Sequence, residues 1–127
     1  MESNEEQRKA AEKLINAMRK RFGSVPVVNQ VMSTRPDLFL PAVSYSGALL
    51  ETEGALGQKT KHLCALAAAS ALGGEYCIEV QMKHAIQDGA DKDEILEAIL
   101  IGAYMANTRS QSYALRKYAK QYGIELE

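Results

Sequence analysis

The side chains best suited to chemistry in this chain of 127 residues are its 2 cysteines, Cys64 and Cys77, and its 2 histidines, His62 and His84. The glycine pair 73–74 stands just before Cys77 and predicts that a helix begins there. Backbone N–H groups and the helix dipole favour a thiolate in a first helical turn. We therefore expect Cys77 to be reactive, the alternative being an ordinary buried cysteine.

The other candidate residues are arranged around Cys77. Gln81 and His84 follow it by four and seven residues, so the three side chains share one helical face. His62 comes from the preceding helix and is a possible proton acceptor, or else an ordinary structural histidine. Cys64 lies in an alanine-rich stretch and is expected in the core. Cys77 with the two histidines could hold a metal ion, but their spacing fits no standard zinc signature, so we expect none.

Composition favours an all-α fold that positions these residues. Alanine and leucine are abundant and there are only 3 prolines. Two capping-box spacings, Ser3 with Glu6 and Asp91 with Glu94, predict helix starts. Pro41 should lie in the first turn of its helix, where proline is tolerated. The predicted helices cover residues 3–22, 27–35, 36–51, 58–72, 75–88, 91–106 and 111–122, with a slackened pattern at 107–110.

Charge and hydropathy exclude several function classes. The chain has 15 Lys+Arg against 16 Asp+Glu, which argues against nucleic-acid binding. It has no apolar run near the ~18 residues that a membrane span needs, and its polar N-terminus is unlike a signal peptide. We expect a cytoplasmic protein with no nucleic-acid or membrane partner. With aromatic residues at 6%, part of the core is expected to be completed by another subunit.

The central part of the sequence resembles a known family. The residues that carry the resemblance are Thr60–Ala67, Gly73–Ile78, Ala85, Gly89–Ala90, Glu94–Ile95 and Glu97. They are similar to the carboxymuconolactone decarboxylase family, which includes the AhpD-like alkylhydroperoxidases. The resemblance covers residues 37–118, with 1–36 as an N-terminal helical segment of the same domain and 119–127 as a tail. It implies an all-α helical bundle in a single domain that assembles into a homo-oligomer, commonly a trimer or hexamer.

The family's active members carry a Cys-x-x-Cys-x-x-x-His pattern and a glutamate in the preceding helix. On this chain the second cysteine of the pattern falls on Cys77. The first falls on Gly74, the histidine on Gln81 and the glutamate on His62. Three of the four positions therefore depart from the pattern.

A second register places the family's histidine on His84. His84 follows Cys77 by seven residues, the separation between the first cysteine and the histidine in the family. The second cysteine would then fall on Val80. This register loses the match at Ala85, Gly89 and Ala90, so the first is preferred.

The resemblance implies a thiol-dependent oxidoreductase with peroxiredoxin-like, antioxidant activity and no cofactor. We expect this activity to be weak or altered, because the pattern is incomplete. Cys77 would react with a peroxide or a disulfide, and His62 or His84 would carry the proton. An external thiol, or Cys64, would resolve the oxidised sulfur. Gly74 and Gln81 favour the alternative of an inactive family member that binds small molecules or serves assembly. A decarboxylase-type lyase is the third possibility.

Overall fold

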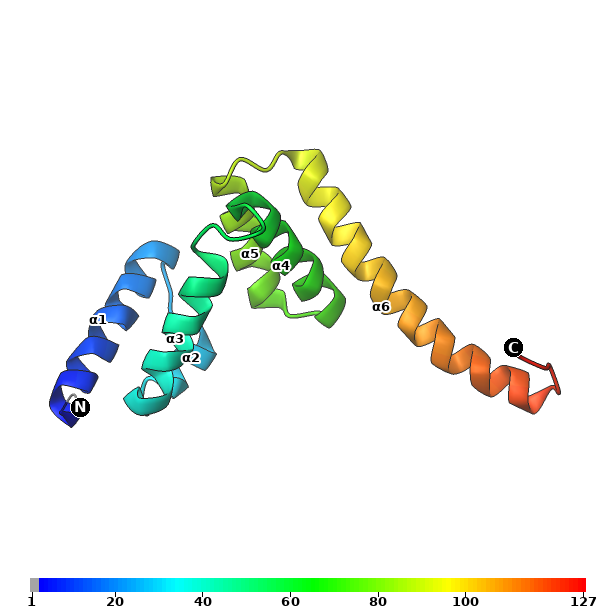
Figure 1. Cartoon of the computed structure of the whole chain (residues 1–127), viewed down its shortest axis with the longest axis horizontal. Helices are drawn as coiled ribbons and strands as arrows, with labels where there is room; N and C mark the ends of the chain where they lie inside the picture. The colour runs from blue at the N-terminus through cyan, green and yellow to red at the C-terminus, as the bar shows by residue number, and fades with distance from the viewer. Residues whose placement is uncertain (1–2) are drawn as a thin grey trace. The chain divides into compact units, whose positions relative to one another are not determined.

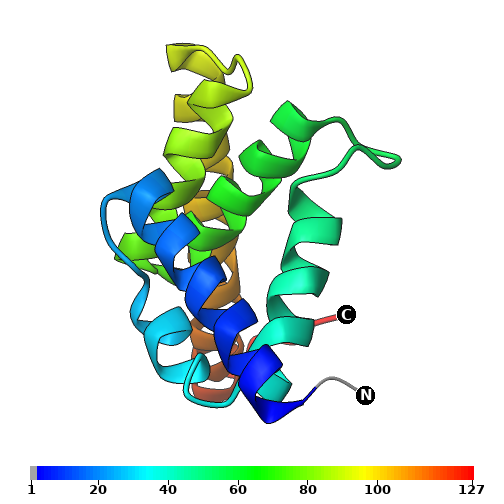
Figure 2. The same cartoon turned by 90° about the vertical axis from the view of Figure 1, so that its left-hand side faces the viewer.

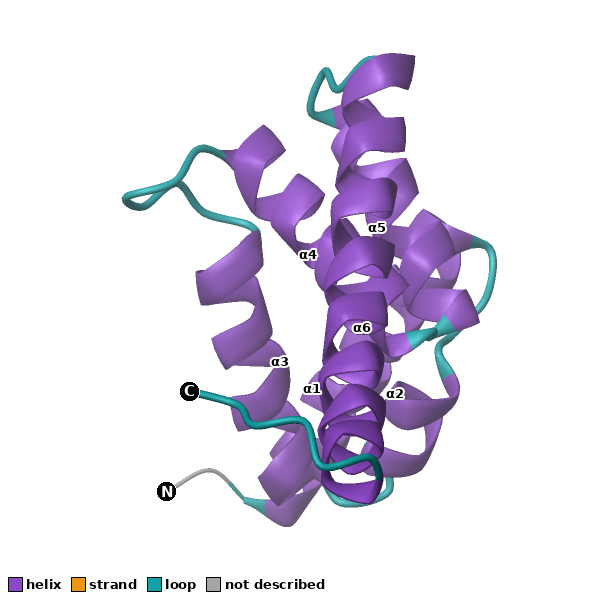
Figure 3. Cartoon of the chain, turned by 90° about the vertical axis from the view of Figure 1, so that its right-hand side faces the viewer, coloured by secondary structure: helices purple, strands orange, loops and turns teal. Residues whose placement is uncertain are grey.

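The described part of the chain, residues 3–127 of a computed structural model, is entirely helical (Figures 1 and 3). The expected all-α class is confirmed. None of the described helices combines the length and the apolar character needed to cross a bilayer. The helices are α1 (Asn4–Phe22), α2 (Val27–Met32), α3 (Pro36–Leu50), α4 (Gln58–Leu72), α5 (Glu75–Gln87) and α6 (Lys92–Gln121).

The contacts divide the chain into two compact units, Met1–Ala55 and Leu56–Glu127. The first two residues lie outside the described part. The domain boundaries expected at residues 36 and 118 remain predictions. The two units are described in turn below.

The first unit packs α1 and the short α2 against α3 (Figure 2). Ser3 and Glu6 form the expected capping box at the start of α1. Gly23 ends this helix with a φ of 78°, a left-handed conformation that favours glycine. The core of the unit consists of the buried side chains of Ala11, Val25 and Phe39.

Pro41 differs from its expected place in α3. The helix begins at Pro36, so Pro41 lies in its second turn and not in the first. A proline there removes the N–H that would bond to the carbonyl of Asp37. Both Pro41 and Asp37 are exposed, so this loss falls on the solvent side of the helix.

The second unit is built around α4, which packs against both α5 and α6. The buried apolar side chains at its centre are small, apart from Leu66; the others are Ala69, Ala85, Ala90 and Ala98. Small side chains let helix backbones approach closely. This unit contains every residue that the sequence singles out for chemistry.

Gly102 marks the closest approach of α6 to α4. A Cβ atom built on Gly102 would lie 2.0 Å from the backbone oxygen of Ala67. No real carbon atom occupies such a position, and the obstructing atom belongs to the backbone of a packed helix. Glycine at this position therefore fixes the distance between the two helices.

The start of α6 agrees with the expected capping box, because Asp91 and Glu94 each accept from the other's backbone N–H. The N–H of Asp91 lowers the pKa of the Glu94 carboxyl, and Lys59 of α4 lowers it further. The Lys59 Nζ lies 2.9 Å from a Glu94 carboxylate oxygen. The first turn of α6 is thus tied both to its own cap and to α4.

The predicted break at residues 107–110 is wrong, because α6 runs without interruption to Gln121. The segment contains no glycine or proline to stop the helix. The Thr108 hydroxyl donates to the carbonyl of Met105 at 3.0 Å within this continuous helix. The polar run therefore marks a change of surface and not a change of structure.

Replacing Gly102 by alanine should destabilise the second unit by about 1–3 kcal/mol, because the added methyl forces α6 away from Ala67. Gly47 in α3 is the matched control, since nothing lies within 4 Å of its Cβ position. There we expect a gain of about 0.5–1 kcal/mol from helix propensity. Urea unfolding followed by circular dichroism measures both. Equal effects of the two substitutions would contradict the close contact.

Candidate functional site

Cys77 is the third residue of α5, and its side chain is exposed. Gly74 is the N-cap, and the carbonyl of Gly74 accepts the N–H of Ile78 at 2.8 Å. The N–H groups of the first turn have no acceptor within the helix. The expected placement of the thiol in a first helical turn is therefore confirmed, and the alternative of a buried thiol is wrong.

One face of α5 carries a line of polar side chains. At about 3.6 residues per turn, Cys77, Gln81, His84 and Asp88 project within a narrow arc of the helix. The Oε1 atom of Gln81 is buried, and no described residue donates a hydrogen bond to it. The face thus runs from an exposed thiol at the start of the helix to buried groups at its end.

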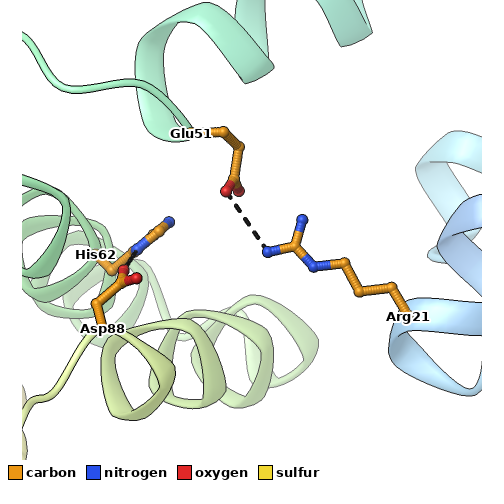
Figure 4. Close-up of polar contacts among 4 residues, drawn as sticks. All are labelled: Arg21, Glu51, His62 and Asp88. Carbon is orange, nitrogen blue, oxygen red and sulfur yellow. Dashed lines mark hydrogen bonds and ion pairs between the residues drawn. The ribbon is translucent and has the colours of Figure 1, made fainter.

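The two histidines meet where this face packs against α4. His62 is 2% exposed and His84 is 5% exposed. Their ring centroids are 4.8 Å apart and their planes are inclined by 63°, an edge-to-face arrangement. The Nδ1 of His62 bonds to the carboxylate of Asp88 (Figure 4). The side chain of Asp88 remains 25% exposed, so this end of the site reaches the surface.

Asp88 was not singled out by the sequence. It follows the last residue of α5 and caps the helix, and its N–H bonds to the carbonyl of His84 at 3.0 Å. The sequence did contain one indication of its position, because Asp88 lies four residues after His84 and so shares the same helix face. Its hydrogen-bond partner His62 is separated from it by 26 residues in sequence. That contact depends on how α4 and α5 pack, which the sequence pattern does not give.

The histidine pair lies at the other end of α5 from Cys77. Seven residues of helix correspond to a rise of about 10 Å between Cys77 and His84. Gln81 lies between them on the same face. A proton passing between the thiol and the imidazoles therefore has to cross the Gln81 turn, and the proton-carrying role of His62 and His84 remains a prediction.

Cys64 is exposed, so its expected place in the core is wrong. The buried face of α4 is formed by His62, Leu66 and Ala69. Cys64 is two residues, and thus about half a turn, away from His62 and lies on the opposite face. The alanine-rich sequence concealed this because small residues occur on every side of α4. Both cysteines are free thiols.

Position 74 lies within reach of the Cys77 side chain. A Cβ atom on Gly74 would be 3.5 Å from the Cβ and 3.8 Å from the Sγ of Cys77. The Cβ atoms of a disulfide are separated by about 3.5–4.5 Å. The backbone of this turn therefore has the geometry of a cysteine pair, although glycine occupies one of its two positions.

Comparison with known proteins identifies the family of this chain. The model of the carboxymuconolactone decarboxylase family matches residues 36–120. The chain belongs to this family. The match covers the segment 37–118 from which the resemblance was argued, and it includes both histidines and both cysteines.

One curated relative is a protein of Paracoccus denitrificans described as uncharacterized protein 4 in cox locus. It is 36% identical over 67 residues, which are 53% of this chain and 60% of the relative. The chain thus matches only part of that protein's length. No solved structure matches the chain significantly.

Proposed function

We propose that this member of the carboxymuconolactone decarboxylase family is a thiol-dependent oxidoreductase that reduces peroxides through Cys77. The observation that carries the proposal is the exposed thiol in the first turn of α5, next to a position with cysteine-pair geometry. In general, the N–H groups of a first helical turn and the helix dipole favour a negative charge. A thiolate is the nucleophile that attacks a peroxide.

The reaction needs two substrates. The thiolate of Cys77 attacks one peroxide oxygen, an S–O bond forms and the O–O bond breaks. Sulfur is oxidised to the sulfenic acid, and the peroxide is reduced to an alcohol or water, which takes up a proton. A low-molecular-weight thiol then displaces water to give a mixed disulfide, and a second thiol releases Cys77 in the reduced form.

An external thiol fits the second step better than Cys64 does. Cys64 lies on the face of α4 opposite His62, whereas Cys77 lies on the face of α5 that carries His84. Without a cysteine at position 74, no neighbour in the same turn can close a disulfide. The cycle thus depends on a reducing compartment, which is consistent with the cytoplasm.

The alternative function is an inactive family member that binds a small molecule. It is favoured by Gly74 and Gln81, which replace a cysteine and a histidine of the family pattern. In that case Cys77 would have no catalytic role. The two functions differ in what happens when the Cys77 sulfur is removed.

Peroxide consumption with excess thiol should fall at least about tenfold in Cys77→Ser, because the hydroxyl does not reduce peroxide. Cys64→Ser is the matched control, since it removes the other exposed thiol, and it should keep the rate within about twofold. Consumption is followed with a peroxide-sensitive dye. A rate unchanged by Cys77→Ser would overturn the oxidoreductase proposal in favour of the small-molecule binding function.

Gly74→Cys sharpens this test. The new thiol would lie beside Cys77 and resolve the sulfenic acid within the same chain. We expect an internal disulfide after one equivalent of peroxide and loss of the requirement for external thiol in that step. The disulfide would leave Cys64 as the one free thiol of this variant. Two free thiols after oxidation would mean that no disulfide formed, which would contradict the geometry of this turn.

We also propose that the chain assembles into a homo-oligomer, a trimer or hexamer as the family resemblance implies, through the outer face of α6. Leu100 and Tyr104 on this face are 57% and 64% exposed. With other α6 residues they line a shallow apolar hollow.

The second half of α6 extends past α4 and α5 (Figure 1). Between Asn107 and Gln121 only Ala119 is buried. A helical segment of about 15 residues, such as this second half of α6, is marginal in water without a packing partner. A second copy covering it would explain its stability.

Size-exclusion chromatography with light scattering should give a mass that is a multiple of the 13.9 kDa chain. A variant with Leu100→Lys and Tyr104→Lys should shift toward the monomer, because charge on a buried interface is costly. Leu72→Lys is the control, since Leu72 is exposed at the end of α4. A monomeric wild type, or a mass unchanged by the double substitution, would overturn the proposed interface.

A further inference from the structure

The chain has 2 histidines, and both are buried side by side in the second unit. His62 comes from α4 and His84 from α5, so the contact is made by the packing of two helices and not by a local turn. The proposed peroxide chemistry at Cys77 does not require such a pair.

The positions of the ring nitrogens suit one metal ion. One nitrogen of His62 and one of His84 lie within 4.8 Å of each other. Two imidazole ligands at about 2.0–2.1 Å in a tetrahedral zinc site have their nitrogens about 3.3 Å apart. The two nitrogens would have to approach by up to about 1.5 Å to share one ion in this geometry.

Asp88 orients His62 in the manner of a metal ligand. The Nδ1–H of His62 donates to the Asp88 carboxylate, which directs the lone pair of Nε2 away from Asp88. Histidine ligands in metal sites almost always donate their other N–H to a carboxylate or carbonyl. Asp88 itself is partly exposed, so this end of the cluster meets solvent.

Gln81 lies on the same side of α5 as His84 and carries an amide oxygen. It lies three residues before His84, and its buried Oε1 accepts no hydrogen bond from a described residue. Water would complete the coordination. Imidazole donors select zinc, cobalt, nickel and copper over magnesium and calcium, which prefer an all-oxygen shell.

We infer that His62 and His84 form a binding site for a divalent transition metal, with zinc as the reference ion and Asp88 as the positioning residue. The inference does not rest on the reactivity of Cys77. When the ion is bound, the imidazole lone pairs are committed to it. The proton-carrying role expected of these histidines then belongs to the metal-free protein.

The test uses the full chain without a histidine tag and with both cysteines replaced by serine, so that no thiolate can bind the ion. Titration with Zn²⁺ in a calorimeter should show one equivalent with a dissociation constant of about 10 µM or tighter. His84→Gln and His62→Gln should each weaken binding at least about 100-fold, and Asp88→Asn about 10–100-fold. Glu79→Gln, which changes an exposed carboxylate on α5, should leave binding unchanged.

Nuclear magnetic resonance of the imidazole nitrogens provides a second readout, because only two histidine rings contribute signals. Zn²⁺ should shift a nitrogen signal of each ring in the cysteine-free protein and in its Asp88→Asn variant, which keeps both ligands. The inference is overturned if the cysteine-free protein binds no Zn²⁺ saturably. It is also overturned if binding leaves both imidazole spectra unchanged.

Discussion

The close packing of α4 against its two neighbours is the constraint on which the second unit depends. Gly102 allows α6 to approach the backbone of Ala67, and small side chains fill the remaining contact with α5. With α4 held in this way, His62 is placed against His84 and Asp88. Widening of the α4–α6 contact would disturb the framework that supports the site. The position of His62 thus depends on glycine and alanine residues that have no reactive side chains.

The sequence was sufficient to predict the helices and where they start. It was not sufficient to predict which face of each helix is buried. Ser3 and Asp91 were identifiable because capping depends on residues only three positions apart. Cys64 was misplaced because an alanine-rich helix gives little periodic signal. The break expected at residues 107–110 was wrong because polar residues on an exposed helix resemble a loop in sequence. The His62–Asp88 contact required the packing of two helices, which no local pattern encodes.

Family membership explains the backbone of the site better than its side chains. The turn at Gly74 has the geometry of a cysteine pair, and Cys77 lies in the first turn of α5. Gly74 and Gln81 stand where the family resemblance would place a cysteine and a histidine. The buried His84 lies further along α5, against His62 of α4. The exposed thiol of Cys77 and the buried imidazole of His84 therefore share one face of α5. Their separation along the helix lets the two be examined independently.

The most direct test of the central claim identifies the cysteine that peroxide oxidises. The wild-type chain is exposed to one equivalent of hydrogen peroxide with a dione probe that traps sulfenic acid, and the labelled peptides are identified by mass spectrometry. We expect the label on Cys77 and little on Cys64, although both thiols are exposed. Equal labelling of the two cysteines, or labelling of Cys64 alone, would contradict the assignment of Cys77 as the reacting group.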